Sequence, residues 1–314
     1  MSSGLLLSNF CRSVWAMHPE RISVVHAVLH RWTCGLPAEA TVMEQVAVDR
    51  AQAAARRQDV QLSAGGQIAV LTLYGILTPR GSVLDVSGPG VTNLQEFSTQ
   101  LRSAVRDLAV AAILIDVDSP GGNVAGVPEL AAEIAAANKT KPVVAIANTW
   151  AASGAYWLAS AAGEFYASPS GEVGSIGVYA IHVDQSKLME MQGVATTLIS
   201  AGEFKTEGNP YGPPSTDFIA YQQSQVDSIY GQFVAAVAKG RKVPVATVRE
   251  GMGQGRMLLA QDAVAQGMVD GIISFNDLVQ QMMKKISAAQ KTGGGQSSRS
   301  GLKAAERQLS LLTT

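Results

Sequence analysis

The chain has few cysteines, few histidines and no excess of charge of either sign. Its 314 residues include 2 cysteines, 4 histidines, 24 basic and 25 acidic residues, which gives a formal net charge of -1. Both cysteines, Cys11 and Cys34, lie near the N-terminus, so no disulfide framework is expected and a reducing compartment is the default. No basic tract is interleaved with aromatic residues, so nucleic acid is not an expected partner.

Long apolar runs are also missing. The run at residues 4–7 (GLLL) is far shorter than the roughly 20 residues of a membrane-spanning helix. The N-terminus does not show a basic region followed by a long apolar one, which would mark a secretory signal. We therefore expect no membrane anchor and a cytoplasmic location.

A metal site is not expected either. His26 and His30 have the i, i+4 spacing that can hold a metal on a helix, but no glutamate follows His26 in an H-E-x-x-H pattern. No third ligand is obvious, so a half-exposed helix face is the better interpretation. The sequence predicts neither a metal nor a cofactor.

The chain does contain a clear three-part organisation. Residues 1–62 are expected to form a helical N-terminal accessory segment, with helices over 19–32 and 42–61. Residues 63–286 form the main domain. From residue 287 glycine and serine become frequent, which is typical of a flexible linker, and a short tail follows to residue 314.

The main domain alternates predicted strands and helices. Apolar and β-branched runs predict strands at 67–77 (with a break at Gly75), 111–117, 142–147, 164–167, 175–180, 195–200 and 268–274. Helical periodicity predicts helices at 93–105, 127–137, 155–162, 186–191, 216–239, 245–252, 259–266 and 276–286. Glycine-rich loops at the strand ends favour right-handed βαβ units, so we expect an α/β fold with a mostly parallel sheet.

Ser153 stands where a strand-like run meets a helical run of small residues. Its neighbours are Ala151, Ala152, Gly154 and Ala155. A serine at such a junction presents its hydroxyl at an edge, near the positive end of a helix, which suits a nucleophile. Taken alone, the position favours the commoner role of a helix-capping serine.

Residues 118–122 (DSPGG) come directly after a predicted buried strand. The paired glycines Gly121 and Gly122 let the backbone turn sharply and expose successive N–H groups. Such donors stabilise a developing oxyanion by about 3–4 kcal/mol each. A plain turn is the alternative, because Pro-Gly pairs form turns often.

A serine nucleophile needs a base, and the histidines supply it poorly. His18, His26 and His30 lie in the N-terminal segment, and His182 follows a predicted strand with no loop landmark. Lys205, in the loop after the predicted strand 195–200, is the alternative base. A lysine base must be neutral, which requires surroundings that exclude water. On these grounds alone a solvated loop lysine remains the simpler interpretation.

Four motifs taken together resemble the signal peptide peptidase A-type serine peptidases, which form peptidase family 49 of the serine class. The motifs are residues 118–122 (DSPGG), 153–156 (SGAY), 174–178 (GSIGV) and 202–205 (GEFK), in the family's order. The resemblance spans about residues 67–286. It implies a ClpP/crotonase-like fold of repeated ββα units and a Ser/Lys catalytic dyad.

The resemblance also implies a role for each matching residue. Ser153 would be the nucleophile, Lys205 the general base, and Ser175 a second serine that hydrogen-bonds the lysine. The oxyanion donors would be three glycines, Gly121, Gly122 and Gly154. For Ser175 the alternative is packing at a strand edge in a glycine-rich turn.

The flanking segments resemble one branch of this family, the phage capsid-maturation proteases. The membrane anchor of the membrane-bound members is replaced by a helical segment around residues 13–20, and a tail follows the domain. This implies cleavage of phage scaffold, capsid or portal proteins, and of the chain's own C-terminal region, in the host cytoplasm or inside a procapsid. It also implies a homo-oligomer that binds polypeptide in extended form.

Three alternatives stay open at this point. A bacterial signal-peptide or protein-quality peptidase of the same family is the nearest. An acyl-CoA enzyme of the crotonase type shares the fold, but it does not need the Ser/Lys pair and no carboxylate motif follows Ser153. An inactive structural homologue is the third, and the presence of both dyad residues argues against it.

Overall fold

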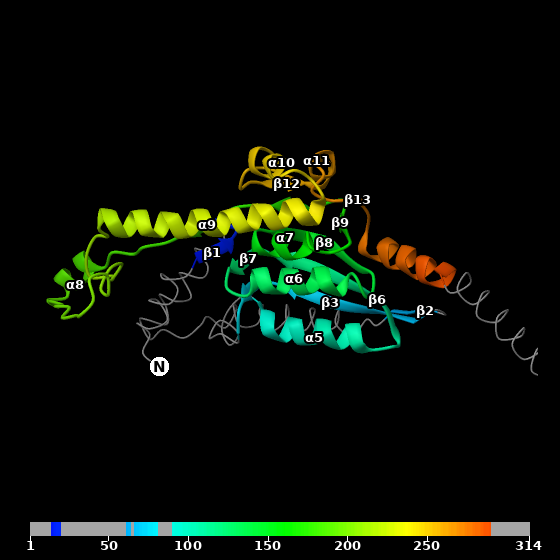
Figure 1. The fold of residues 1–314 in the computed structure, drawn as a ribbon, viewed down its shortest axis with the longest axis horizontal. Coiled ribbons are helices and arrows are strands. Elements are labelled where there is room, and N and C mark those ends of the chain that lie inside the picture. The colour runs from blue at the N-terminus through cyan, green and yellow to red at the C-terminus, as the bar shows by residue number, and fades with distance from the viewer. Residues whose placement is uncertain (1–13, 20–60, 64–65, 81–89, 290–314) are drawn as a thin grey trace, which may run out of the picture.

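The computed structural model describes residues 14–19, 61–63, 66–80 and 90–289 (Figure 1). Its centre is a twisted sheet whose strands β3 (Gly66–Tyr74), β6 (Val110–Ser119) and β8 (Val143–Ala152) run parallel. These strands are apolar on both faces, which is why the sheet is covered on both sides. The remaining strands of this sheet are β2 (Gln61–Ser63), β9 (Glu164–Ala167), β10 (Glu172–Gly174), β12 (Met257–Leu259) and β13 (Gly271–Ile272).

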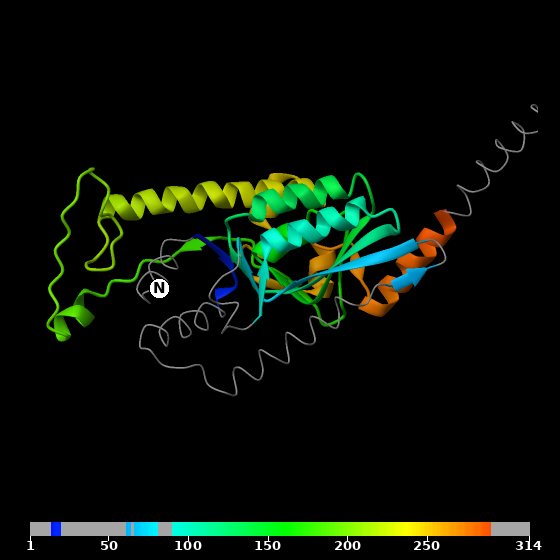
Figure 2. The same cartoon turned by 90° about the horizontal axis from the view of Figure 1, so that it is seen from below.

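Helices cover one face of the sheet in a layer (Figures 1 and 2). They are α5 (Leu94–Arg106), α6 (Val127–Ala137), α7 (Gly154–Ala159) and the C-terminal half of α9 (Thr216–Arg241). On α9, the fully buried side chains are Phe233, Val234, Val237 and Ala238, all near its C-terminal end. Trp157 of α7 stacks on Phe233 with ring centroids 4.6 Å apart, which anchors α9 to the body.

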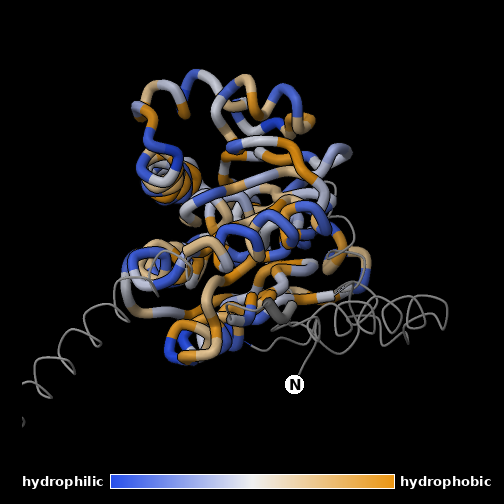
Figure 3. Tube along the Cα trace, turned by 90° about the vertical axis from the view of Figure 1, so that its right-hand side faces the viewer, coloured by the Kyte–Doolittle hydropathy of each residue, from blue (hydrophilic) through white to orange (hydrophobic). Residues whose placement is uncertain are grey.

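The opposite face of the sheet is covered by the helix over residues 275–289. Its residues Leu278, Val279 and Met282 are buried against Ile68 and Leu114 of the sheet. Apolar segments therefore gather in the middle of the molecule, between the two helical layers (Figure 3). Two separate cores result, one on each face of the sheet.

A second, smaller sheet lies at the end where β3 and β6 stop. Its order is β11-β1-β7-β4-β5, with β1 (Val14–Met17), β4 (Ile76–Thr78), β5 (Val91–Asn93), β7 (Gly121–Asn123) and β11 (Tyr179–Ala180). Gly75, with φ of 68°, makes the break between β3 and β4. Because β7 leaves β6 directly, this sheet brings the DSPGG turn next to the start of α7.

An arm extends from the body along α9 (Figure 2). It contains α8 (Ser186–Met191), the segment between α8 and α9, and the N-terminal half of α9. At the other end of α9, a small lobe holds α10 (Val245–Glu250), β12 and α11 (Ala260–Ala265). Arg241 joins these parts, since its guanidinium bonds Asp270 at 2.6 Å and Gly267 O at 3.0 Å.

The predicted α/β architecture with a mostly parallel sheet is confirmed, and so are most element positions. Residues 127–137, 164–167 and 186–191 form α6, β9 and α8 with the predicted bounds. Asn93 caps α5, its side chain accepting hydrogen bonds from the N–H groups of Gln95 and Glu96.

Four predictions of secondary structure were wrong. The predicted strand at 268–274 is reduced to Gly271–Ile272. The segment at 13–20 was expected to be helical, but Val14–Met17 form strand β1 because they pair with β7 and β11. Residues 195–200 form no strand. Residues 175–180 are mostly irregular, with only Tyr179–Ala180 in a strand. The predicted helices at 19–32 and 42–61, the His26/His30 pair and most of the C-terminal tail lie outside the described residues.

Candidate active site

Ser153 sits at a sharp turn between β8 and α7 and has a backbone conformation that serine rarely adopts. Its φ is 53° and its ψ is -116°, and the residue is only 1% exposed. Such backbone strain costs on the order of 1–3 kcal/mol and persists only where the surroundings impose it. The N–H of Ser153 donates to Gly174 O at 2.7 Å, which holds the turn from one side.

The hydroxyl of Ser153 does not cap α7. Its Oγ donates a hydrogen bond to Gly177 O at 3.2 Å, and the N-terminus of α7 has no side-chain cap. The helix-capping interpretation is therefore wrong for this serine. The strained turn aims Oγ away from its own helix, toward the loop after β10.

The helix after Ser153 fixes the position of the serine because all of it is buried. Every residue of α7 is buried, and those from Ala155 to Ala159 are at most 2% exposed. The Tyr156 hydroxyl donates to Met268 O at 3.0 Å, and burial raises the pKa of this phenol well above its ordinary value. Trp157 packs on Phe233. Both aromatic side chains thus belong to the core, and only the N-terminal end of α7 meets the site.

The loop after β10 wraps around Ser153. Ser175 has φ of 53° and is 5% exposed, and its N–H donates to Arg256 O at 2.8 Å. Gly174 and Gly177 on either side of it supply the two carbonyl groups that bond Ser153. The structure therefore brings Ser175 next to Ser153. Both residues have a positive φ, so two strained backbone positions lie side by side. The carbonyl of Gly177 was not among the predicted site residues, although the motif at 174–178 pointed to this loop.

The DSPGG turn lies against the first residue of α7. Gly121 has φ of 85°, and a Cβ placed on it would lie 2.9 Å from Gly154 N, so no side chain fits there. The N–H of Gly121 donates to Ser119 Oγ at 3.2 Å, and that hydroxyl donates to Gly75 O at 2.6 Å. Gly154, as the first residue of α7, has an N–H without an intrahelical partner. Of the three predicted oxyanion glycines, Gly154 has the strongest geometric support.

Lys205 lies on a different part of the molecule. It is exposed, in a turn where its N–H donates to Gly202 O at 3.1 Å. This turn belongs to the segment between α8 and α9, at the outer end of the arm, whereas α7 lies in the body (Figures 1 and 2). Within one chain, the described structure does not bring this lysine to Ser153.

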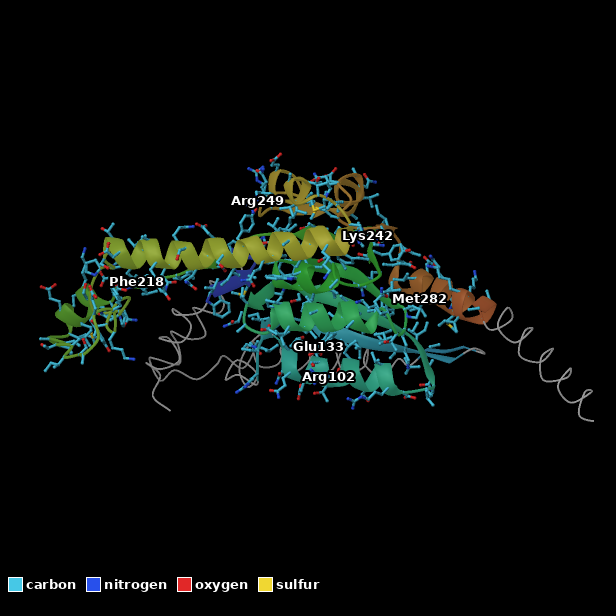
Figure 4. All side chains as sticks on the ribbon, in the orientation of Figure 1. Arg102, Glu133, Phe218, Lys242, Arg249 and Met282 are labelled. Atoms are coloured by element: carbon cyan, nitrogen blue, oxygen red, sulfur yellow. The ribbon has the colours of Figure 1, made fainter. Side chains whose placement is uncertain are left out.

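His182, the histidine of the main domain, is also directed elsewhere. Its Nε2 lies 3.1 Å from Asn209 O, and its ring meets the edge of Phe218 with centroids 5.9 Å apart. Phe218 is in the outer part of α9 (Figure 4). These contacts of His182 are therefore in the arm, and this histidine does not pair with Ser153. Over the described ranges, no group of three potential metal ligands is clustered, and no helix combines the length and hydrophobicity needed to cross a membrane.

Comparisons with known proteins match the chain to a peptidase family. The sequence model of Peptidase family S49 matches residues 135–289, a range that contains Ser153, Ser175 and Lys205 but begins after Gly121 and Gly122. The chain is 33% identical over 221 residues to capsid assembly protease C of Escherichia phage lambda, covering 70% of this chain and 50% of that protein. It is also 33% identical over 220 residues to a putative signal peptide peptidase SppA of Enterococcus faecium, covering 70% of this chain and 63% of that protein.

Solved structures give weaker similarities. A membrane-bound stomatin-specific protease matches 68% of this chain and 84% of its own with a TM-score of 0.45 and 15% identity. A ClpP1 variant from Listeria monocytogenes matches 67% of this chain and 94% of its own with a TM-score of 0.43 and 16% identity. The chain spans between half and two thirds of the length of the two relatives named above. On the sequence match to the family model, residues 135–289 of the chain form a Peptidase family S49 domain.

Proposed function

We propose that the protein is a serine endopeptidase in which Ser153 is the nucleophile. The observation that carries the proposal is the strained, buried turn at Ser153, which points Oγ away from α7 while the Gly154 N–H begins the same helix. A nucleophile and a donor for the oxyanion are then on adjacent residues. The glycines Gly121 and Gly122 complete the proposed oxyanion site from the β7 side, where the N–H of Gly121 would exchange its hydrogen bond to Ser119 Oγ for one to the oxyanion.

The reaction would proceed in two acyl-transfer steps. Oγ of Ser153 attacks the carbonyl carbon of a peptide bond while Lys205 Nζ, in its neutral form, takes the hydroxyl proton. The negative charge that develops on the carbonyl oxygen is stabilised by the N–H of Gly154 and the glycine pair. The lysine returns the proton to the leaving amine, and water then releases the acyl group from Ser153 by the same route.

In this proposal the lysine comes from the arm of a neighbouring protomer. One chain leaves Lys205 exposed on the arm, and the arm also exposes several large apolar side chains. These are Met191 at 84%, Ile199 at 96%, Phe204 at 64% and Tyr221 at 56% exposed. Clustered exposed apolar residues mark a protein contact, and a contact there would also exclude water from the lysine. Ser175, beside Ser153, would then orient the arriving amine.

The proposed substrates are phage scaffold, capsid or portal proteins, together with the chain's own C-terminal region. The support is the similarity to capsid assembly protease C of phage lambda over 70% of this chain. The similarity to a putative signal peptide peptidase supports the alternative, a bacterial peptidase that trims other polypeptides. The structure of the site is the same in both cases.

A cleavage assay separates these substrates. The purified chain and Ser153→Ala are each incubated with a candidate scaffold protein, a coat protein and a signal peptide, and products are identified by mass spectrometry. The capsid proposal expects cuts in scaffold or coat protein that Ser153→Ala does not make. Cuts confined to the signal peptide would favour the alternative, and equal behaviour of the two chains would contradict the peptidase proposal.

A further inference from the structure

Strand β1 runs through the candidate active site. It pairs antiparallel with β7, where Met17 is opposite Gly121 and Ala16 is opposite Gly122. On its other edge it pairs antiparallel with β11, where Trp15 is opposite Tyr179. The sheet order β11-β1-β7 means that β7 and β11 are joined only through β1. Without β1, two strand edges would face each other about 10 Å apart, a gap that one extended peptide fills.

The carbonyl oxygen of Ala16 lies close to two glycines of the proposed oxyanion site. A Cβ placed on Gly121 would come within 2.1 Å of Ala16 O, and a Cβ on Gly154 within 3.1 Å of the same atom. The backbone of β1 therefore passes directly over the residue that follows Ser153. A peptide bond attacked by Ser153 would need its carbonyl in this same place.

The side chains of β1 are buried in the body of the protein. Trp15, Ala16 and Met17 are 4%, 0% and 1% exposed. Ala16 is fully buried, and a Cβ built on Gly154 would be in van der Waals contact with both Ala16 Cβ at 3.6 Å and Leu77 Cδ1 at 3.5 Å, so the Ala16 methyl group lies close to Gly154 and Leu77. This position accepts a small side chain, and a long one would have to displace β1 or the start of α7.

His18, which follows β1, extends the contact between this segment and the body. The N–H of His18 donates to Pro120 O at 2.7 Å, and the His18 ring meets the edge of Trp150 with centroids 5.8 Å apart. Val124 N–H donates to Val14 O at 3.2 Å at the other end of the strand. The segment 14–18 is thus held along its whole length on the edge of β7.

We propose that β1 is an internal pseudosubstrate: residues 14–17 occupy the groove between β7 and β11 in which a polypeptide substrate binds, and they must leave it before a substrate can enter. The proposal rests on the proposed peptidase function. It also names a substrate preference, an extended peptide with a small residue at the position of Ala16, because Leu77 and Gly154 close the space there. A main-chain ladder with β7 and β11 supplies the remaining recognition.

A substitution that expels β1 tests the proposal in the full-length chain. Ala16→Arg puts a long charged side chain where the native residue is fully buried. The proposal predicts that kcat/KM for a peptide substrate rises about tenfold or more. In the wild type only the molecules whose groove is free can bind substrate, which weakens the apparent affinity, and expelling β1 removes this loss. Leu108→Arg, at a position 99% exposed in the body, is the matched control and should leave kcat/KM unchanged.

A peptide added in trans gives the complementary result. A synthetic peptide of residues 13–19 (SVWAMHP) should inhibit the Ala16→Arg variant competitively, and the same peptide with arginine in place of its alanine should not. An Ala16→Arg variant that is folded, by its melting temperature and circular dichroism, but no more active than wild type would overturn the proposal. So would a lack of competition by the peptide.

A measurement on the wild-type chain covers the case in which Ala16→Arg does not fold. The tripeptide aldehyde Val-Trp-Ala-H forms a reversible adduct with an active serine, and hydrogen–deuterium exchange then reports on residues 14–17. The proposal predicts faster exchange of these amides when the aldehyde is bound. If Ser153 binds the aldehyde and residues 14–17 stay protected, the pseudosubstrate proposal is wrong and the peptidase proposal stands. If Ser153 reacts with no serine reagent in any variant, both are wrong.

Discussion

The hydroxyl of Ser153 donates a hydrogen bond to the carbonyl oxygen of Gly177 at a distance of 3.2 Å. A carbonyl oxygen cannot accept the proton that a serine must lose in order to attack, so this bond describes a resting hydroxyl. The base has to approach from outside the loop 174–178. This is why the location of Lys205 on an exposed arm matters for the mechanism, and why a second copy of the chain enters the account.

The first prediction concerns the origin of the lysine. Ser153→Ala and Lys205→Ala should each be inactive alone, but oligomers assembled from a mixture of both should recover about a quarter of wild-type activity, because half of the protomers keep the serine and half of their neighbours keep the lysine. Peptide cleavage by co-expressed variants measures this. A mixture as inactive as its parts would place the lysine in the same chain as its serine.

The second prediction concerns Gly121. Gly121→Ala should lower kcat/KM by 100-fold or more, a loss of about 2.7 kcal/mol, because the alanine would stand in a backbone region that only glycine adopts easily. The new Cβ would lie 2.1 Å from Ala16 O of β1, but it would also lie 2.9 Å from both Ala152 O and Gly154 N, so the start of α7 is displaced even when β1 has left. Gly231→Ala in α9 is the control, since nothing lies within 4 Å of its Cβ. The control should keep its activity and gain about 0.5–1 kcal/mol of stability from helix propensity. Equal activity of both variants would remove the DSPGG turn from the mechanism.

The third prediction separates two roles for Ser175. If Ser175 orients the lysine, Ser175→Ala should reduce kcat by about 10- to 100-fold with little change in KM. Its melting temperature should stay close to that of wild type, because the Ser175 contact that shapes the loop is made by its backbone N–H to Arg256 O. A variant that loses stability and keeps kcat would show that Ser175 only packs at the strand edge.

The fourth prediction concerns stability and pH. Burial alone would raise the pKa of Asp270, but hydrogen bonds from the Arg241 side chain and the Phe165 N–H hold it below its ordinary value. The Asp270 side chain is 39% exposed and Arg241 6%, so Asp270→Asn should cost about 2 kcal/mol, between the values for exposed and for buried pairs.

The sign of the pH dependence follows from the lowered pKa. The carboxylate contributes its stability above the ordinary aspartate pKa of about 3.9 and loses it as the pH falls through the lower value in the folded state. Urea unfolding of the wild type and Asp270→Asn should therefore show a difference in the free energy of unfolding at pH 7, and this difference should shrink below about pH 4. A gap that is constant from pH 7 to pH 3 would contradict the role of this ion pair.

The sequence was sufficient for the main sheet and for the strand-to-helix junction at which the proposed nucleophile lies. Continuous apolar runs such as the one at β6 have few other uses than a strand buried on both faces, and Ser153 lies at the junction that the pattern indicated. The turn residues Gly121 and Gly174 were also visible, because their positive φ values need glycine.

What the sequence could not predict depends on partners far along the chain. Val14–Met17 become a strand only because β7 and β11 offer edges on both sides, and no local pattern reports that. The apolar residues at 195–200 are like a strand in composition, but they lie in the arm without a neighbour to pair with. The distance between Ser153 and Lys205 is set by the direction of the arm, which the spacing in sequence does not fix.

The most direct test of the account is covalent labelling of the serine. A fluorophosphonate is added to the wild-type chain, to Ser153→Ala and to Lys205→Ala at protein concentrations that span oligomer assembly, and the modified peptide is identified by mass spectrometry. The account predicts one adduct on Ser153 in the wild type, formed faster as the oligomer assembles, none in Ser153→Ala, and slow labelling in Lys205→Ala. Labelling of another serine, or equal labelling of all three chains, would contradict it.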